Sequence, residues 1–104
     1  MDLFVPVCGL GELRDGEAKV VEVEGRKIAL FRLGDDVHAL DNICPHRGGP
    51  IGEGEVRGDR VTCPWHEWTF DIPSGLCTLN PAARLTRYEA RVVDGEVLVC
   101  PRAD

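Results

Sequence analysis

Short segments in which apolar and polar residues alternate recur along the chain, each ending at a turn signal after about eight to twelve residues. Residues 19–41, KVVEVEGRKIALFRLGDDVHALD, alternate in this way and predict three strands. Turns are expected at Glu24-Gly25 and at Gly34-Asp35-Asp36, because glycine and aspartate are the residues that tight turns favour.

Three more hairpins are predicted further along the chain. Residues 55–63 turn at Gly58-Asp59, residues 68–79 turn at Pro73-Ser74-Gly75, and residues 88–100 turn at Asp94-Gly95. No segment shows a sustained helical period. The pattern therefore predicts an all-β fold of roughly eight to ten short strands, a small antiparallel sandwich or barrel that spans residues 1–104 as one domain.

Length and charge narrow the possible functions. A chain of 104 residues suits one hydrophobic core, and its net charge of -6 argues against nucleic acid and against an anionic membrane surface. An acidic protein is steered instead toward basic patches on a partner protein. The start of the chain lacks the features of a signal peptide, and its apolar runs are far too short to span a bilayer, so a cytoplasmic location is expected.

The strand pattern is interrupted by two pairs of metal-binding residue types. Cys44 and His46 stand one residue apart, Cys63 and His66 stand two apart, and a glycine-rich connector begins after the first pair. The chain has five cysteines, an odd number that suits metal binding in a reducing compartment better than a disulfide framework.

Two kinds of metal centre could use this set of ligands. Zinc accepts two cysteines and two histidines in a tetrahedron, although its usual sites place like ligands together. A [2Fe-2S] cluster can be bound asymmetrically, with two thiolates on one iron and two imidazoles on the other. Two loops that each offer one cysteine and one histidine suit the asymmetric cluster better.

The combined spacing, C-x-H, sixteen residues and then C-x-x-H, resembles the Rieske motif. The surrounding CPHRGGPIGEGEV and CPWHEWTFDIPSG are similar to soluble, low-potential Rieske-type ferredoxins and to the small Rieske subunit of assimilatory nitrite reductases. The resemblance implies the Rieske fold, in which a small cluster-binding subdomain, here about residues 42–82, is inserted in an antiparallel base domain. It also implies one [2Fe-2S] cluster per chain, with Cys44 and Cys63 on the buried iron and His46 and His66 on the outer iron.

Several positions depart from the high-potential members of this family. Those proteins join their cluster loops by a disulfide, at positions that are Gly49 and Trp65 here. They also place hydroxyl donors near the cluster at positions that are Trp68 and Phe70 here. Donors to the sulfurs stabilise the reduced cluster, so their loss predicts a reduction potential at the low end of the Rieske range, around -150 mV.

Three further features lie close to these loops. Glu67 stands where the family commonly has glycine, and it could lower the potential or simply point into solvent. Trp65 and Trp68 flank His66, where they could shield the cluster or form a docking surface. The alternative is core packing, which is the expectation for Trp68 and Phe70. Residues 80–82, Asn-Pro-Ala, lie where the family has a third loop that covers the cluster, so they form either such a lid or an ordinary turn.

No catalytic set of residues is visible, so the protein is not expected to be an enzyme. The expected function of a chain with this cluster is one-electron transfer. The resemblance implies a carrier between a flavin reductase and an oxygenase. A small Rieske subunit of a nitrite reductase is the alternative, and a zinc-stabilised interaction module is a third. His38 is expected to be structural, and no ligand role is predicted for the remaining cysteines, Cys8, Cys77 and Cys100.

Overall fold

A computed structural model describes residues 3–45, 48–65, 67–80 and 82–103. The described residues form nine strands and two short 3-10 helices. The strands are β1 (Val5–Gly9), β2 (Ala18–Val23), β3 (Arg26–Leu33), β4 (Asp36–Asp41), β5 (Glu55–Arg57), β6 (Arg60–Thr62), β7 (Thr69–Asp71), β8 (Arg87–Val93) and β9 (Glu96–Ala103). The helices are η1 (Leu10–Glu12) and η2 (Ile51–Glu53).

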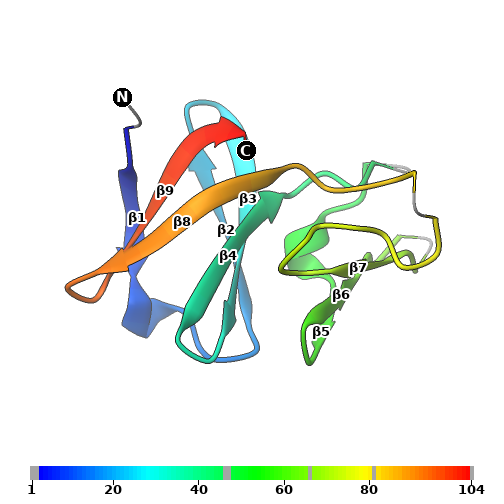
Figure 1. Cartoon of the computed structure of the whole chain (residues 1–104), viewed down its shortest axis with the longest axis horizontal. Helices are drawn as coiled ribbons and strands as arrows, with labels where there is room; N and C mark the ends of the chain where they lie inside the picture. Colours follow the sequence, from blue (N-terminus) through cyan, green and yellow to red (C-terminus); the bar gives the residue numbers. More distant parts are fainter. Residues whose placement is uncertain (1–2, 46–47, 66, 81, 104) are drawn as a thin grey trace.

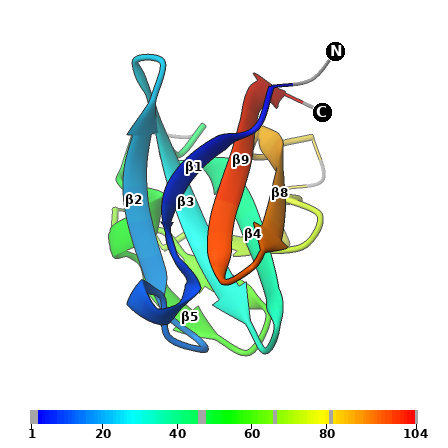
Figure 2. The same cartoon turned by 90° about the vertical axis from the view of Figure 1, so that its left-hand side faces the viewer.

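The larger sheet has six antiparallel strands in the order β1-β9-β8-β4-β3-β2. Its two edge strands, β1 and β2, approach each other, so the sheet curls into a nearly closed barrel (Figure 2). Strand β1 begins and strand β9 ends at the same end of this barrel (Figure 1). The barrel removes most of the open edges that an exposed sheet would present.

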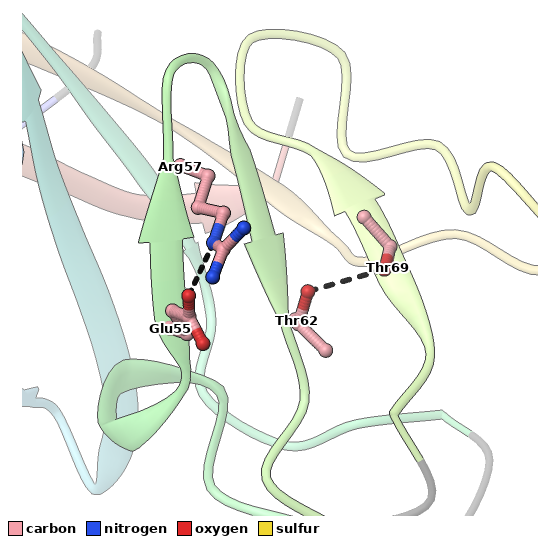
Figure 3. Close-up of polar contacts among 4 residues, drawn as sticks. All are labelled: Glu55, Arg57, Thr62 and Thr69. Atoms are coloured by element: carbon pink, nitrogen blue, oxygen red, sulfur yellow. Dashed lines mark hydrogen bonds and ion pairs between the residues drawn. The ribbon is translucent and has the colours of Figure 1, made fainter.

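The smaller sheet has three antiparallel strands in the order β5-β6-β7 and lies beside the barrel (Figure 1). Glu55 and Arg57 form an ion pair along β5, and the hydroxyls of Thr62 and Thr69 lie 3.2 Å apart across β6 and β7 (Figure 3). The hydroxyl contact lies where β6 ends and β7 begins, so it joins the two sides of the loop between them.

Strand β3 joins the two halves of the molecule, because it is buried on both faces. Ile28 and Leu30 face the barrel interior, whereas Ala29 and Phe31 face the smaller sheet, and all four are fully buried. This agrees with the alternation of side chains along a strand. The second face belongs to a separate apolar cluster, made of Ala29, Phe31, Leu40, Cys44, Ile51, Val61, Cys63, Phe70, Ile72, Cys77 and Leu85.

The predicted all-β architecture is confirmed, and the three strands expected in residues 19–41 are β2, β3 and β4. The hairpin expected over residues 68–79 is only partly regular, because its return arm makes one bridge to β7, Phe70 to Cys77, and another to the following segment, Leu76 to Arg84. Asp71 accepts hydrogen bonds from the backbone and hydroxyl of Ser74 and so shapes the turn between the arms. Among the described residues there is no helix with the length and apolar character that crossing a bilayer requires.

Candidate metal centre

The first loop with predicted ligands joins β4 to η2 and is closed at its base by backbone pairing. Ile43 and Pro50 form a bridge, and the Cys44 amide donates to the Gly49 carbonyl at 2.9 Å. The buried Asn42 holds the loop from below, since its Oδ1 accepts the Gly52 amide at 2.7 Å. Cys44 therefore lies just inside a firmly closed loop and is itself buried.

The second loop joins β6 to β7 and repeats this arrangement. The Cys63 amide donates to the Trp68 carbonyl at 2.7 Å, so each cysteine donates to the carbonyl five residues later. The Thr62 and Thr69 hydroxyls close the same base (Figure 3). Cys63, like Cys44, is buried at the start of its loop.

The two loops bring the two thiols together. The side chains of Cys44 and Cys63 hydrogen-bond, and the backbone of Trp65 hydrogen-bonds to the Cys63 sulfur. Burial raises the pKa of the Cys63 thiol, Cys44 raises it further, and the bond from Trp65 acts in the opposite direction. Without a metal, burial and the neighbouring Cys44 therefore favour the protonated form of the Cys63 thiol.

Gly49 permits the close approach of the loops. A Cβ built on Gly49 would lie 2.7 Å from the Cys63 Sγ and 3.0 Å from the Trp65 Cβ. Contacts this short are not tolerated, so only glycine leaves room for the sulfur. The positions that carry a bridging disulfide in other members of the resembling family, Gly49 and Trp65, are thus close together in space.

The other two predicted ligands, His46 and His66, lie outside the described residues, as does Arg47. The described part of the chain accordingly contains no group of three or more candidate metal ligands. Cys44 and Cys63 are the predicted ligands that the structure brings together. All five cysteines are described and all are free thiols; Cys8 and Cys100 lie on the neighbouring strands β1 and β9.

A third segment lies against the second loop. Thr78 donates from its amide and hydroxyl to the Thr69 carbonyl at 2.8 and 3.2 Å, and the Cys77 amide donates to Ala83 at 3.1 Å. Within it, the Asn80 side chain accepts the Ala82 amide at 3.0 Å, whereas Pro81 lies outside the described residues. Residues 77–80 and 82–83 thus lie at the same end of the molecule as the two cysteine loops (Figure 1).

The aromatic residues around the second loop have separate environments. Phe70 is fully buried and Trp68 packs against the same apolar cluster, which confirms the core packing expected for both. Trp65 is 51% exposed, so it remains available to a partner. His38 is half-buried on β4 opposite Phe31.

Glu67 has a backbone conformation that glycine adopts most easily. Its φ is 55°, in the left-handed region, and its side chain is exposed. Glu24 and Asp94 have similar φ angles, but each begins a tight hairpin turn completed by glycine. The glycine expected by resemblance at position 67 therefore has a structural reason, and the glutamate is strained there.

The described residues fit the thiolate half of an asymmetric cluster. Two adjacent sulfurs emerge from two equivalent loops into apolar surroundings, where a pair of thiolates would repel each other unless a metal ion balanced their charge. The support that the Asn42 side chain gives to the first loop is not predicted from the sequence. The only sequence signal for it is that this asparagine immediately follows a predicted strand.

Comparison with known proteins gives a consistent result. Residues 3–89 match the Rieske [2Fe-2S] domain family. The ferredoxin component of the alkene monooxygenase system of Xanthobacter autotrophicus is 36% identical over 92% of this chain and 80% of its own length.

Two solved structures resemble the chain over nearly its full length. One chain of a complex of reduced oxygenase and oxidized ferredoxin in carbazole 1,9a-dioxygenase has a TM-score of 0.91 and 27% identity, covering 100% of this chain and 98% of that one. A structure described as an NADH-dependent nitrite reductase small subunit from Mycobacterium tuberculosis has a TM-score of 0.90 and 29% identity, covering 100% and 99%.

Proposed function

Because the chain belongs to the Rieske [2Fe-2S] domain family, we propose that it carries single electrons from a flavin reductase to an oxygenase. It is an electron-transfer protein rather than an enzyme, like the ferredoxin components that it resembles. The observation that supports this most is the buried pair Cys44 and Cys63, held together at the bases of two equivalent loops.

The proposed ligands are Cys44 and Cys63 at one iron and His46 and His66 at the other. Residues 42–82 would form the cluster-binding subdomain within the domain of residues 1–104. When bound, the [2Fe-2S] cluster accepts and releases one electron. The spacing of the ligands and the convergence of the two thiols support this assignment.

The remaining side chains control the surroundings of the sulfurs. Phe70, Ile72 and Leu85 exclude water from the inner side, because all three are fully buried in the cluster that contains the cysteines. The Trp65 amide holds the Cys63 sulfur in place. Residues 80–82 would cover the site on another side, as a lid that follows the attachment of Thr78 to β7.

The choice of an oxygenase as the electron acceptor rests on the relatives. Ferredoxin components of oxygenase systems match this chain over 92% of its length, and the carbazole 1,9a-dioxygenase complex contains a chain of the same fold. The reductase as donor and a cytoplasmic location are part of the same proposal. The free thiols of all five cysteines are compatible with a reducing compartment.

A second candidate is the small subunit of a nitrite reductase. It is favoured by the full-length similarity to the Mycobacterium tuberculosis structure. The two candidates differ in their assembly, because a diffusible carrier elutes alone whereas a subunit elutes with its reductase. Gel filtration of the protein from its natural source separates them.

The proposed function is tested by chemical analysis and electron transfer together. Anaerobically purified protein should contain iron and acid-labile sulfide in equal amounts and should give a Rieske-type EPR signal after reduction. It should then pass electrons to an oxygenase in the presence of a flavin reductase and NADH. Stoichiometric zinc without sulfide would disprove the proposal.

A further inference from the structure

A groove of about 880 Å³ lies beside the proposed cluster site, between the end of the barrel and the first two loops. Its lining includes Arg26 and Lys27 from the start of β3, Asp41 from the end of β4, and Trp65 from the second loop. The groove therefore extends from the candidate metal centre to the β2–β3 hairpin.

The groove has a basic side and an apolar side. Arg26 and Lys27 are both exposed at its β3 side, and the Arg26 guanidinium is oriented by donating to the Pro101 carbonyl at 3.3 Å. Ile43 and Trp65 form the apolar side and are 55% and 51% exposed. The two sides are adjacent, because the Asn42 amide, next to Ile43, donates to the Lys27 carbonyl at 3.1 Å.

The charge of the groove is opposite to that of the whole chain. The protein has a net charge of -6, but among the described residues that line the groove, two are cations and one is a carboxylate. That carboxylate, Asp41, accepts a hydrogen bond from the Ile43 amide at 3.4 Å rather than pairing with Arg26 or Lys27. In the described part of the chain, neither cation forms a close ion pair, although Glu22 lies opposite Lys27 on β2. Arg26, and Lys27 in competition with Glu22, can therefore bind a carboxylate from another protein.

We propose that this groove binds a segment of the redox partner in which a carboxylate side chain lies close to an apolar one. The carboxylate would pair with Arg26 or Lys27, which alternate between the two faces of β3, and the apolar side chain would cover Ile43 and contact Trp65. The inference rests on the proposed function, since it assumes a protein partner for the electron. It places part of the recognition away from the cluster ligands, on the β2–β3 hairpin.

A macromolecular segment fits these observations because exposed aromatic and aliphatic side chains are typical of protein interfaces, where charged pairs at the rim add selectivity. Trp65 also makes the groove continuous with the second ligand loop. A partner bound there would lie beside the candidate metal centre, as electron transfer requires.

The probe for this proposal is a phage-displayed random peptide library, selected on the immobilised, cluster-loaded protein. The selected peptides should combine Asp or Glu with an aromatic or aliphatic residue. Their affinity, measured by fluorescence polarisation, should fall by at least about 10-fold in the double variant Arg26→Glu/Lys27→Glu, because the contact with the carboxylate becomes repulsive. Added salt should weaken binding to the unmodified protein.

The matched control is Arg57→Glu/Arg60→Glu, which changes the net charge equally on the β5–β6 hairpin, outside the groove. It should change peptide affinity by less than about twofold. Basic selected peptides, equal losses in both double variants, or no selected binder would overturn the proposal.

The cluster is followed in the same samples. Both double variants should keep the iron content and EPR signal of the unmodified protein, because none of the four residues lies in the proposed ligand set. Absence of the cluster from all samples would instead refute the proposed electron-transfer function, so the two failures are distinguishable.

Discussion

At the scale of single residues, Glu67 is the clearest conflict between side chain and backbone. Its left-handed φ of 55° costs a non-glycine residue about 1 kcal/mol or more. Glu67→Gly should therefore stabilise the cluster-loaded protein by about 1 kcal/mol and raise its thermal midpoint by about 4 °C or more. Thermal loss of the cluster absorbance measures this change.

The control for Glu67 is Glu67→Gln, which removes the charge but keeps the strained backbone. It should leave the thermal midpoint nearly unchanged. A midpoint that rises in the glutamine variant and not in the glycine variant would show that charge, and not backbone conformation, destabilises this loop.

Gly49 is the residue on which the approach of the two loops depends. Gly49→Ala should lower the iron and sulfide content strongly, because its Cβ would lie 2.7 Å from the Cys63 Sγ. Gly11→Ala is the matched control, since a Cβ there meets nothing within 4 Å. Full cluster content in the Gly49 variant would contradict the arrangement of the two thiols described above.

Phe70 is the position at which the predicted low reduction potential can be changed. It is fully buried in the apolar cluster that contains Cys63, and it carries no hydroxyl. Phe70→Tyr should raise the potential from around -150 mV by tens of millivolts, since about 1.4 kcal/mol of preferential stabilisation corresponds to about 59 mV for one electron. Protein-film voltammetry measures the shift.

Phe70→Leu, which adds no donor, is the comparison and should not raise the potential. An unmodified protein with a potential above about +100 mV would refute the argument from missing hydroxyls.

At the scale of elements, the first loop depends on its attachment to η2 through Asn42. Asn42→Ala should destabilise the protein by about 1–3 kcal/mol, because it leaves the Gly52 amide without its acceptor. Asn80→Ala removes a similar bond, to the Ala82 amide, at an exposed site and should cost less. Thermal unfolding measures the loss of stability in the two variants. An equal or larger loss for Asn80→Ala than for Asn42→Ala would contradict this prediction.

The elements with simple local patterns were predictable from the sequence. The hairpins around Glu24-Gly25 and Asp94-Gly95 were identified because alternating residues flank a turn dipeptide, and both turns occur. Strand β1 was not among the predicted ranges, since Pro6 and an irregular register between Pro6 and Cys8 interrupt its pattern. The return arm after β7 is less regular than the sequence predicts, because part of its pairing is with residues 83–85 and not with β7.

At the scale of the whole molecule, the two apolar clusters divide the chain into parts with different dependence on the metal. Cys44 and Cys63 belong to the cluster beside the smaller sheet, and neither belongs to the cluster inside the barrel. Removal of the metal should therefore loosen residues 42–82 much more than the barrel strands. Hydrogen exchange before and after chelation measures this difference, and equal loss of protection in both parts would contradict it.

The position of the candidate site was largely predictable, and its surroundings were not. The spacing of Cys44, His46, Cys63 and His66 is a local pattern that can be recognised in a single sequence. The groove between Arg26 and Trp65 depends on how the barrel and the loops pack, and nothing in the sequence near either residue indicates it. The need for glycine at position 49 likewise arises from a contact with a cysteine fourteen positions away.

The most direct test of the proposed ligand set is pulsed EPR of the reduced protein labelled with ¹⁵N-histidine. Two histidine nitrogens should couple to the unpaired electron, and the coupling should persist in His38→Gln, which leaves only His46 and His66. A spectrum without nitrogen coupling, or one whose coupling disappears in the His38 variant, would contradict a cluster bound by Cys44, His46, Cys63 and His66.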